Sequence, residues 1–419
     1  MKKFLITGVS VRSKGGEAMV FETYKKIMEI DPDNIVSLLS TNPEYDTSFI
    51  NRVTEPIDID VLDGMSPGFV KNRYLNFGVT KLINVRDLLS MVLNRVFLRH
   101  SNREIGYKSP QFKHIAACDC VLQIAGISFS KDFGRFSAFG WAKQMLLVRI
   151  MGKKYFCMPQ SMGPSDDWFI NLCAKYGLNN VTYIMPRGER SIEYLKKLDL
   201  RNSRVQFVPD LAFAFDNPCE EEDQKIYSRY GLDPAKKYVA VVFNTHLYNW
   251  GGMPMVRMIS TIIDNMIESY GYTVILIAHE VNDKNRVDDR YVNNVIFDHC
   301  KNKSNLLNVQ DDLRANEIKS LLKCCDFTLC SRFHGMVSSL KVGVVPIVIG
   351  WADKYFEIMK LFDLEDLVVD YSRGSIEDIE ERISYVISHN SELKEQIQSF
   401  LPQYENSSEI MKGIVVNNI

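Results

Sequence analysis

The chain has 419 residues, a formal net charge of −2, and 46% hydrophobic and 24% charged side chains. Because a single hydrophobic core stops growing beyond roughly 250–300 residues, this length predicts two domains. The balanced charge argues against nucleic acid as the general partner, since proteins that bind phosphate backbones carry a clear basic excess.

The first predicted elements are a strand within MKKFLITGV and a helix that starts near GGEAM. The N-terminal apolar run is too short for a signal peptide and has no small-residue cleavage site, so we interpret it as the first strand of a cytosolic fold. The turn between strand and helix offers Ser13, Gly16 and Glu17, where backbone amides and a carboxylate could meet a ligand. The turn does not match the GxGxxG fingerprint, which argues against NAD.

Residues 71–103 differ from the rest of the chain because they carry seven Lys or Arg and one acid, Asp87, interleaved with apolar residues. Such a stretch could lie against an anionic membrane surface or a diphosphate-lipid. It could equally be the solvated face of an ordinary helix. The sequence leaves both interpretations open.

Short apolar runs and helical patterns then alternate up to residue 215, which is typical of a parallel sheet covered on both faces. Ligands bind such sheets beyond the carboxyl ends of the strands. The turns at those ends offer four polar or glycine positions: Gly126, Asp132, Gln160 and Arg187. An arginine there could hold a carboxylate or phosphate. Each turn taken alone is more often a loop without a binding site.

Residues 216–236 combine proline, an acidic cluster and a GLDP turn, so we predict a linker there. It would join an N-terminal domain over 1–215 to a second strand-and-helix series over 237–375. The sequence therefore predicts an α/β protein with two Rossmann-like domains facing one cleft. The last helices, within 376–419, could pack back across the junction.

The stretch CSRFHGMVSSLKVGVVPIVIG places Ser331, Arg332 and His334 at a strand-to-helix turn. Free backbone amides and the helix dipole attract anions at such a turn. Arg332 would add a rigid positive fork and His334 a titratable proton. The alternative is that Arg332 pairs with a structural carboxylate and His334 caps the helix. His246 and His279 also follow predicted strands, and either could enter the cleft.

The nine cysteines fall mostly in apolar segments, without the paired CxxC spacing or the histidine partners typical of zinc. We interpret them as reduced core residues. No HxxEH, DxD or CxxC grouping demands a metal, so we predict none.

Taken together, these stretches resemble the polysaccharide pyruvyl transferase family. The family's SR[FY]H segment, GxPxxx[IV] strand and following lysine are similar to Ser331–His334, to Gly343 with Pro346, and to Lys354. Its upstream segments R[DE]xxS, PD, QSxGP and GDx[AI] are similar to Arg187–Ser191, Pro209–Asp210, Gln160–Pro164 and GGEAM. This sequence departs from the pattern where Glu17 replaces the usual Asp and Gly188 replaces an acid.

The resemblance implies a fold like that of GT-B glycosyltransferases and transfer of the enolpyruvyl group of phosphoenolpyruvate to a sugar as a cyclic ketal. Phosphoenolpyruvate would be the donor substrate, and no separate cofactor is expected. The residues predicted for catalysis are His334 and Arg332. Those predicted to bind the donor are Arg187, Ser331, Arg332, Phe333 and Lys354. Those predicted to line the acceptor side or the cleft are Ser13, Gly16, Glu17, Gly126, Asp132, Gln160 and His246.

The acceptor could be a lipid-linked sugar, such as one carried on undecaprenyl diphosphate, a nucleotide sugar or a finished polymer. The basic stretch 71–103 favours a lipid-linked acceptor and a cytoplasmic protein peripheral to the inner face of the membrane. Two alternatives stay open: a GT-B glycosyltransferase with a nucleotide-sugar donor, and a non-catalytic sugar- or anion-binding component of polysaccharide assembly.

Overall fold

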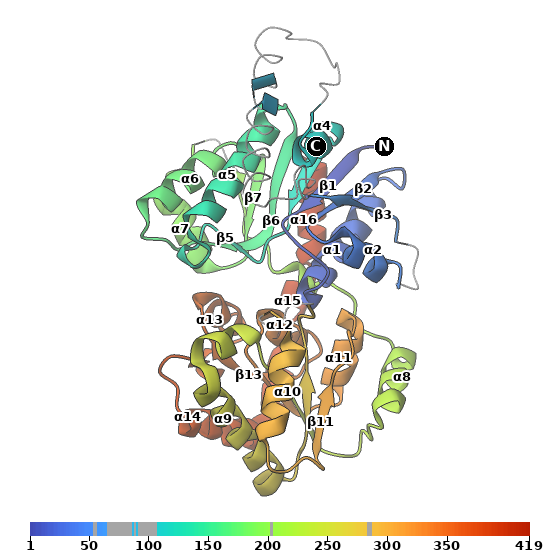
Figure 1. Cartoon of the computed structure of the whole chain (residues 1–419), viewed down its shortest axis with the longest axis vertical. Coiled ribbons are helices and arrows are strands. Elements are labelled where there is room, and N and C mark those ends of the chain that lie inside the picture. The colour runs from blue at the N-terminus through green and yellow to red at the C-terminus, as the bar shows by residue number, and fades with distance from the viewer. Residues whose placement is uncertain (53–56, 65–85, 88, 91–106, 202–203, 283–286) are drawn as a thin grey trace, which may run out of the picture. The chain divides into compact units, whose positions relative to one another are not determined.

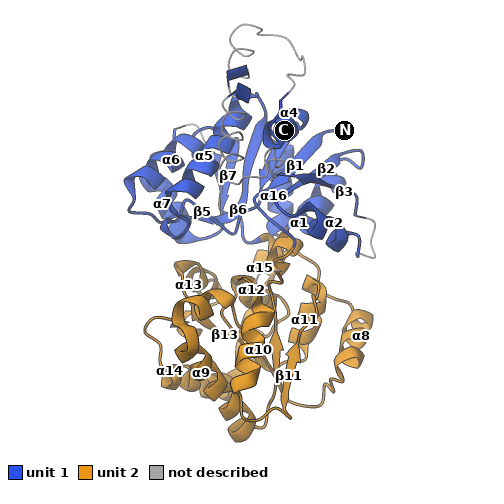
Figure 2. Cartoon of the chain, in the orientation of Figure 1, with its two compact units in different colours: residues 1–11, 20–210, 407–419 blue, residues 12–19, 211–406 orange. Residues whose placement is uncertain are grey.

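The computed structural model describes the chain except residues 53–56, 65–85, 88, 91–106, 202–203 and 283–286. Contacts divide it into two compact units (Figure 2). Unit 1 comprises residues 1–11, 20–210 and 407–419, and unit 2 comprises residues 12–19 and 211–406.

The unit 1 sheet is parallel throughout, with the order β3-β2-β1-β4-β6-β7-β8 and a short β5 beside β6 (Figure 1). Its strands are β1 (Lys3–Thr7), β2 (Ile35–Ser40), β3 (Ile59–Asp63), β4 (Cys120–Gln123), β5 (Ile127–Ser128), β6 (Lys154–Met162), β7 (Tyr183–Pro186) and β8 (Arg204–Val205). Strand β4 is buried at every position, as expected of a strand covered by helices on both faces.

The α-helices that group with unit 1 connect these strands or close the chain. They are α1 (Lys14–Ile30), α2 (Pro43–Ile50), α4 (Pro110–Ala117), α5 (Gly134–Ile150), α6 (Trp168–Leu178), α7 (Glu189–Lys197) and α16 (Ser407–Val416), with the 3₁₀ turn η1 (Lys131–Phe133) before α5. The start of α1, up to Met19, groups with unit 2.

The unit 2 sheet is also parallel, with the order β11-β10-β9-β12-β13-β14. Its strands are β9 (Tyr238–Val242), β10 (Thr273–Ile277), β11 (Leu306–Val309), β12 (Phe327–Cys330), β13 (Val345–Gly350) and β14 (Val368–Asp370). This is the doubly wound order of a Rossmann fold, and it reverses between β9 and β12. A ligand of such a sheet binds beyond the carboxyl ends of those two strands.

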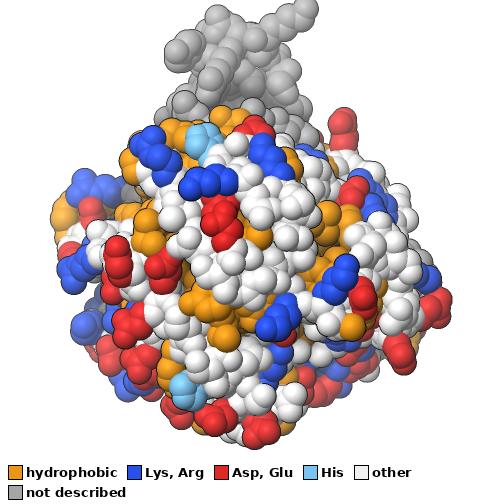
Figure 3. Space-filling view, turned by 90° about the horizontal axis from the view of Figure 1, so that it is seen from below, with side chains coloured by type: hydrophobic (Ala, Val, Ile, Leu, Met, Phe, Trp, Pro, Cys, Tyr) orange, Lys and Arg blue, Asp and Glu red, His pale blue; other side chains and the backbone are white. Residues whose placement is uncertain are grey.

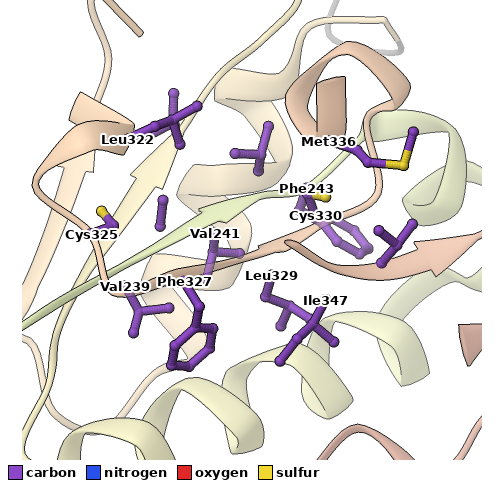
Figure 4. Close-up of a cluster of buried hydrophobic side chains, with 14 of the residues drawn as sticks. Val239, Val241, Phe243, Leu322, Cys325, Phe327, Leu329, Cys330, Met336 and Ile347 are labelled. Atoms are coloured by element: carbon purple, nitrogen blue, oxygen red, sulfur yellow. The ribbon is translucent and has the colours of Figure 1, made fainter. Parts of the chain in front are cut away.

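Helices cover the unit 2 sheet and complete its core. They are α8 (Glu220–Tyr230), α9 (Thr245–Tyr270), α10 (Asp289–His299), α11 (Ala315–Lys323), α12 (Phe333–Lys341), α13 (Asp353–Lys360), α14 (Ile376–Phe400) and α15 (Pro402–Glu405), with the 3₁₀ turns η2 (Leu211–Phe213) and η3 (Glu365–Leu367). Figure 4 shows buried side chains of the central strands, among them Val241, Phe327, Leu329 and Ile347, gathered in this core. Their burial fixes the strand ends from which the functional turns project.

The two α/β units with parallel sheets agree with the predicted fold class. Segment 216–236, which was predicted to be a linker, is instead part of unit 2. It contains α8, which packs on α11 inside unit 2. Its acidic cluster occupies the first turn of that helix, where carboxylates are favourable beside the positive end of the helix dipole. Helix α14 also groups with unit 2, and the chain rejoins unit 1 only at Ser407.

The predicted basic stretch 71–103 falls outside the described residues apart from 86–87 and 89–90, so its membrane role stays a prediction. No helix within the described part of the chain is long and apolar enough to cross a bilayer. Acidic and basic side chains are interspersed on the face seen in Figure 3, in keeping with the small net charge.

Candidate active site

The turns after β9 and β12 are joined at the point where the unit 2 strand order reverses. The amide of Asn244, after β9, donates to Oγ of Ser331, after β12, at 2.9 Å. The side-chain Nδ2 of Asn244 donates to the carbonyl oxygen of Ser331 at 2.6 Å, and the Tyr355 hydroxyl donates to the same oxygen at 2.7 Å. Ser331 is fully buried, and its hydrogen bonds hold this turn together. Because its hydroxyl is not exposed, the structure gives no support to the contact between Ser331 and the donor that the sequence predicted.

Arg332 is held by two carboxylates in this turn. Its Nε and Nη2 donate to the two oxygens of Asp289 at 2.9 and 2.6 Å, and its Nη1 donates to Glu280 at 2.6 Å. Burial alone would lower the pKa of Arg332, but the two carboxylates outweigh burial and raise it. The guanidinium is therefore a fixed cation. This is the structural pairing that the sequence left open, and a direct contact with the donor stays a prediction.

Asp289, which the sequence analysis did not single out, is the centre of this network. Besides Arg332, its fully buried carboxylate accepts hydrogen bonds from the amide and hydroxyl of Thr245 at 3.1 and 2.9 Å. It also accepts from the amides of His279 and Glu280 at 3.3 and 2.9 Å. Asp289 thus ties together the turns that follow β9, β10 and β12. The DD pair at the start of α10 was a visible signal, but only the fold shows which strand ends it reaches.

His334 lies in the first turn of α12 with its ring edge-on to Phe333, at a centroid distance of 5.1 Å. Gly15, from the segment 12–19, packs directly against the imidazole. A Cβ atom at Gly15 would lie 2.0 Å from Cγ of His334, closer than any real contact allows. Glycine is therefore needed at position 15 because an imidazole occupies the space of its side chain.

Segment 12–19 is anchored to unit 2 by two buried ion pairs. Glu17 accepts from Nε and Nη2 of Arg314 at 3.1 and 3.0 Å and from the amide of Ala315 at 2.9 Å, at the start of α11. Lys14 pairs with Asp312 at 2.7 Å. Burial raises the pKa of Glu17, and the cations of Arg314 and Lys14 partly offset that effect.

This anchor changes the interpretation of three predicted acceptor residues. Glu17 and Gly16 are fully buried, and Glu17 has its carboxylate engaged, so neither offers the open position that an acceptor contact requires. Ser13 is half-buried and pairs with Glu280 through an isolated backbone bridge. The segment functions as a support for His334.

Replacing Gly15 by alanine is expected to displace the His334 ring and lower turnover at least about tenfold, because the new methyl group and the imidazole cannot occupy the same space. Gly413→Ala is the matched control, since nothing lies within 4 Å of its added Cβ in α16. Steady-state kinetics of both variants test this expectation. Wild-type kcat in Gly15→Ala would show that the imidazole position is not needed.

Two further imidazoles neighbour this turn. Burial lowers the pKa of His279 well below its usual value, and nearby His334, Arg332 and Lys14 lower it further. Burial and then Arg332 also lower the pKa of His246, against the opposing carboxylate of Glu280. Both rings are therefore neutral at pH 7. His246, half-buried where His279 is fully buried, is the one that a substrate could reach.

The ammonium group of Lys354 lies over three aromatic rings of unit 2. Its Nζ lies 4.4 Å from the ring centroid of Trp351, 5.2 Å from that of Phe333 and 5.5 Å from that of Tyr355. Such contacts hold an ammonium group in place. Phe333 therefore contacts both His334 and Lys354, and it is buried, so it positions these groups. Trp250, which is 55% exposed, extends the aromatic cluster from Trp351 at a centroid distance of 5.5 Å.

Arg187, which the sequence predicted as a donor-binding residue, belongs to unit 1. This side chain is 1% exposed and pairs with Asp210 of the PD segment. It also donates to Oγ of Ser161 at 3.1 Å and to the carbonyl oxygen of Gly126 at 2.6 Å. These partners make Arg187 a structural ion pair, so its predicted donor role is not carried into our proposal.

The two remaining residues predicted in unit 1 differ in exposure. Gln160 is buried, with its Nε2 3.4 Å from Oε1 of Gln123. Asp132 is exposed and accepts from the Ser130 hydroxyl at 2.8 Å. Their acceptor roles stay predictions.

The family model of polysaccharide pyruvyl transferases matches residues 15–353 of this chain. The chain belongs to this family. The match begins at Gly15 and includes the Arg332 and His334 turn. Lys354, the lysine that the resemblance assigns, follows the last matched residue in this pyruvyl transferase.

The pyruvyl transferase is similar in sequence to a curated protein and in fold to solved structures. It is 22% identical over 301 residues to the amylovoran biosynthesis protein AmsJ of Erwinia amylovora, covering 68% of this chain and 69% of AmsJ. Its fold is similar to that of UDP-GlcNAc 2-epimerase from Neisseria meningitidis bound to UDP-GlcNAc, with a TM-score of 0.66, 11% identity and full coverage of both chains. It is also similar to S. aureus MnaA with UDP, with a TM-score of 0.62, 10% identity and coverage of 100% and 98%. These likenesses confirm the predicted GT-B fold class.

Two further observations concern possible metal ligands and the cysteines of this pyruvyl transferase. Within the described residues, no group of three or more His, Cys, Asp or Glu side chains could hold a metal ion. All nine cysteines are free, and seven are buried, which agrees with the predicted core positions. Burial raises the pKa of Cys120 to about 11, so its thiol is protonated and unreactive at neutral pH.

Proposed function

We propose that this pyruvyl transferase moves the enolpyruvyl group of phosphoenolpyruvate onto a pair of sugar hydroxyls in a surface-polysaccharide precursor and releases phosphate. The observation that carries the proposal is the His334 imidazole, seated against Gly15 beside the Arg332–Asp289 pair at the strand-order reversal. The family match supports the transferase class.

The reaction forms two carbon–oxygen bonds at one carbon, the first by addition and the second by displacement of phosphate. A proton goes to the methylene carbon of phosphoenolpyruvate while a sugar oxygen bonds to the adjacent carbon and loses its proton. A second sugar hydroxyl then bonds to that carbon, loses its proton, and phosphate leaves with the bonding pair. The products are one cyclic ketal and one phosphate. Chemistry of this kind requires an acid, a base and fixed positive charge near the leaving group.

The turn residues of unit 2 match these requirements. His334 is our candidate for the acid that protonates the methylene carbon. His246 is the candidate base, because a half-buried imidazole with a lowered pKa is neutral and able to accept a proton at pH 7. Lys354, held over aromatic rings, supplies positive charge for the carboxylate and phosphate of the donor. Arg332 adds a fixed cation beside His334, although Asp289 and Glu280 offset its charge.

The acceptor that we propose is a lipid-linked sugar at the inner face of the membrane, as the basic stretch 71–103 indicates. The similarity of AmsJ, an amylovoran biosynthesis protein, supports a polysaccharide precursor as the acceptor class. A nucleotide-sugar donor is the alternative, because two structural neighbours were solved with UDP or UDP-GlcNAc.

Incubation with phosphoenolpyruvate and a panel of sugar acceptors is expected to release phosphate and to give one acceptor the mass of an added pyruvate less water. Thermal-shift measurements separate the two donors beforehand, and stabilisation by phosphoenolpyruvate alone is the expected result. Stabilisation by UDP or UDP-GlcNAc, with no response to phosphoenolpyruvate, would contradict the proposal.

A further inference from the structure

Among the described residues of unit 1, a cluster of exposed large apolar side chains lies on α5, on the η1 turn before it, and on α6, which packs beside α5 (Figure 1). We call it the α5–α6 surface. Its residues are Phe133 (47% exposed), Phe136 (95%), Phe139 (55%), Trp168 (66%), Leu172 (45%) and Tyr176 (62%). Soluble monomers rarely expose apolar groups in such numbers on neighbouring elements, and patches of this kind mark interaction sites.

The spacing of these residues gives α6 a second apolar face. Trp168, Leu172 and Tyr176 recur every four residues and share one side of α6. The opposite side of α6 is already buried, by Ile170, Cys173, Ala174, Gly177 and Leu178. Apart from Asn171 and Lys175, α6 is therefore apolar on both sides, a pattern expected of a helix in a core or against lipid. The outer side of α6 is exposed, so an apolar environment for these side chains has to come from outside the chain.

Charge in these two helices favours an anionic partner. Neither residues 134–150 nor residues 168–178 contain an Asp or Glu, whereas they contain Arg135, Lys143, Arg149 and Lys175. The nearest acid on the α6 side, Asp167, caps that helix and pairs with Arg135 at 2.8 Å. Arg135 in turn lies 5.9 Å from the ring centroid of Trp168, so the first turns of both helices are joined.

A lipid surface fits this combination better than a second copy of the chain. Aromatic rings concentrate at the level of lipid headgroups, and Lys and Arg beside them attract anionic lipids. Arg135 and Lys175 already have carboxylate partners, Asp167 and, at 3.7 Å, Asp199. In a two-fold symmetric dimer the same surface would face itself, so the remaining cations, Lys143 and Arg149, would oppose those of the other copy with no acid in either helix beside them.

We propose that the α5–α6 surface docks this protein onto anionic membranes, with Phe136 and Trp168 inserted among the headgroups. Phe133 of this surface ends the η1 turn, which also contains Asp132, where the sequence predicted an acceptor contact. Docking would therefore present that turn of unit 1 towards lipid-linked sugars. The inference does not depend on the reaction, because membrane binding is measured without turnover.

Co-sedimentation of the full chain with vesicles tests the proposal. We expect binding to vesicles that contain phosphatidylglycerol, weaker binding to pure phosphatidylcholine, and loss of binding as salt is raised. The double variant F136S/F139S should bind at least about tenfold more weakly, because two exposed rings no longer leave water. Lys175→Glu should weaken binding to anionic vesicles alone.

Tyr385→Ser is the matched control, because Tyr385 is an aromatic residue of α14, outside this surface, and is 48% exposed. It should bind vesicles as the wild type does, and thermal unfolding should show that all variants fold. Equal binding of F136S/F139S and the wild type would overturn the proposal. So would a wild-type protein that ignores vesicles, or one whose dimerisation, measured by analytical ultracentrifugation, is what the double substitution abolishes.

Discussion

Replacing His334 by alanine is expected to lower kcat for pyruvyl transfer by about 10²–10⁴-fold and to leave KM for phosphoenolpyruvate within a few-fold of the wild-type value. In the proposed mechanism the imidazole supplies a proton in the transition state, whereas Arg332 and Lys354 bind the donor equally in the ground and transition states. Steady-state kinetics with phosphate release as the readout measure both constants.

Stability should change little in this variant, because His334 is only partly buried and its α12 neighbours carry the packing. His299→Ala is the matched control. His299 is an exposed imidazole whose Nδ1 lies 2.8 Å from the carbonyl oxygen of Val295, and its loss should leave kcat unchanged. A His334→Ala protein with wild-type kcat and a raised KM would remove the acid role and leave a donor-binding role.

The rescue of His334→Ala by added imidazole provides a second readout. A small imidazole can enter the space left beside Gly15 and restore proton transfer, and the restored rate should rise with imidazole concentration. A structural loss would not respond in this way. Thermal unfolding of the variant, measured without imidazole, shows whether the fold is intact before rescue is attempted.

Much of the fold was predictable because parallel strands buried on both faces appear as continuous apolar runs. FTLC of β12 and YVAVV of β9 are examples, and each is fully buried. The turn that bears Arg332 and His334 was predictable for the same reason, since it directly follows such a run. The linker prediction was wrong because the first turn of a helix and a linker can both be rich in charged residues. Only the packing of α8 on α11 distinguishes the two.

The partners of the functional residues could not be predicted, because they are distant in sequence. Arg332 and Asp289 are 43 positions apart, and Arg314 and Glu17 are 297 apart. No local periodicity or turn signal encodes such pairs. The alternative that the sequence did state, a structural carboxylate beside Arg332, is the one that the structure contains, and its identity required the fold.

Replacing Asp289 by alanine is expected to lower the free energy of unfolding by about 3–5 kcal/mol, because it leaves the buried guanidinium of Arg332 without its main counter-charge. The same change should also abolish most of the activity, since three strand-end turns lose their common acceptor. Urea unfolding measures the first effect, and phosphate release under saturating substrate measures the second.

Asp311→Ala provides the matched control, because Asp311 pairs with Arg229 at 3.0 Å at an exposed site, where such a pair contributes about 0–1 kcal/mol. Equal stability losses in Asp289→Ala and Asp311→Ala would contradict the buried network.

The double variant D289A/R332M separates the structural role of the pair from its functional one. Removing both charges should recover part of the stability that Asp289→Ala loses, because the fully buried charge is gone together with its partner and the only carboxylate that loses Arg332 is Glu280, whose side chain is 25% exposed. Activity should stay low in the double variant, since the reaction still lacks the fixed cation beside His334. Recovery of activity together with stability would show that Arg332 and Asp289 serve the fold alone, and the positive charge for the donor would then have to come from Lys354.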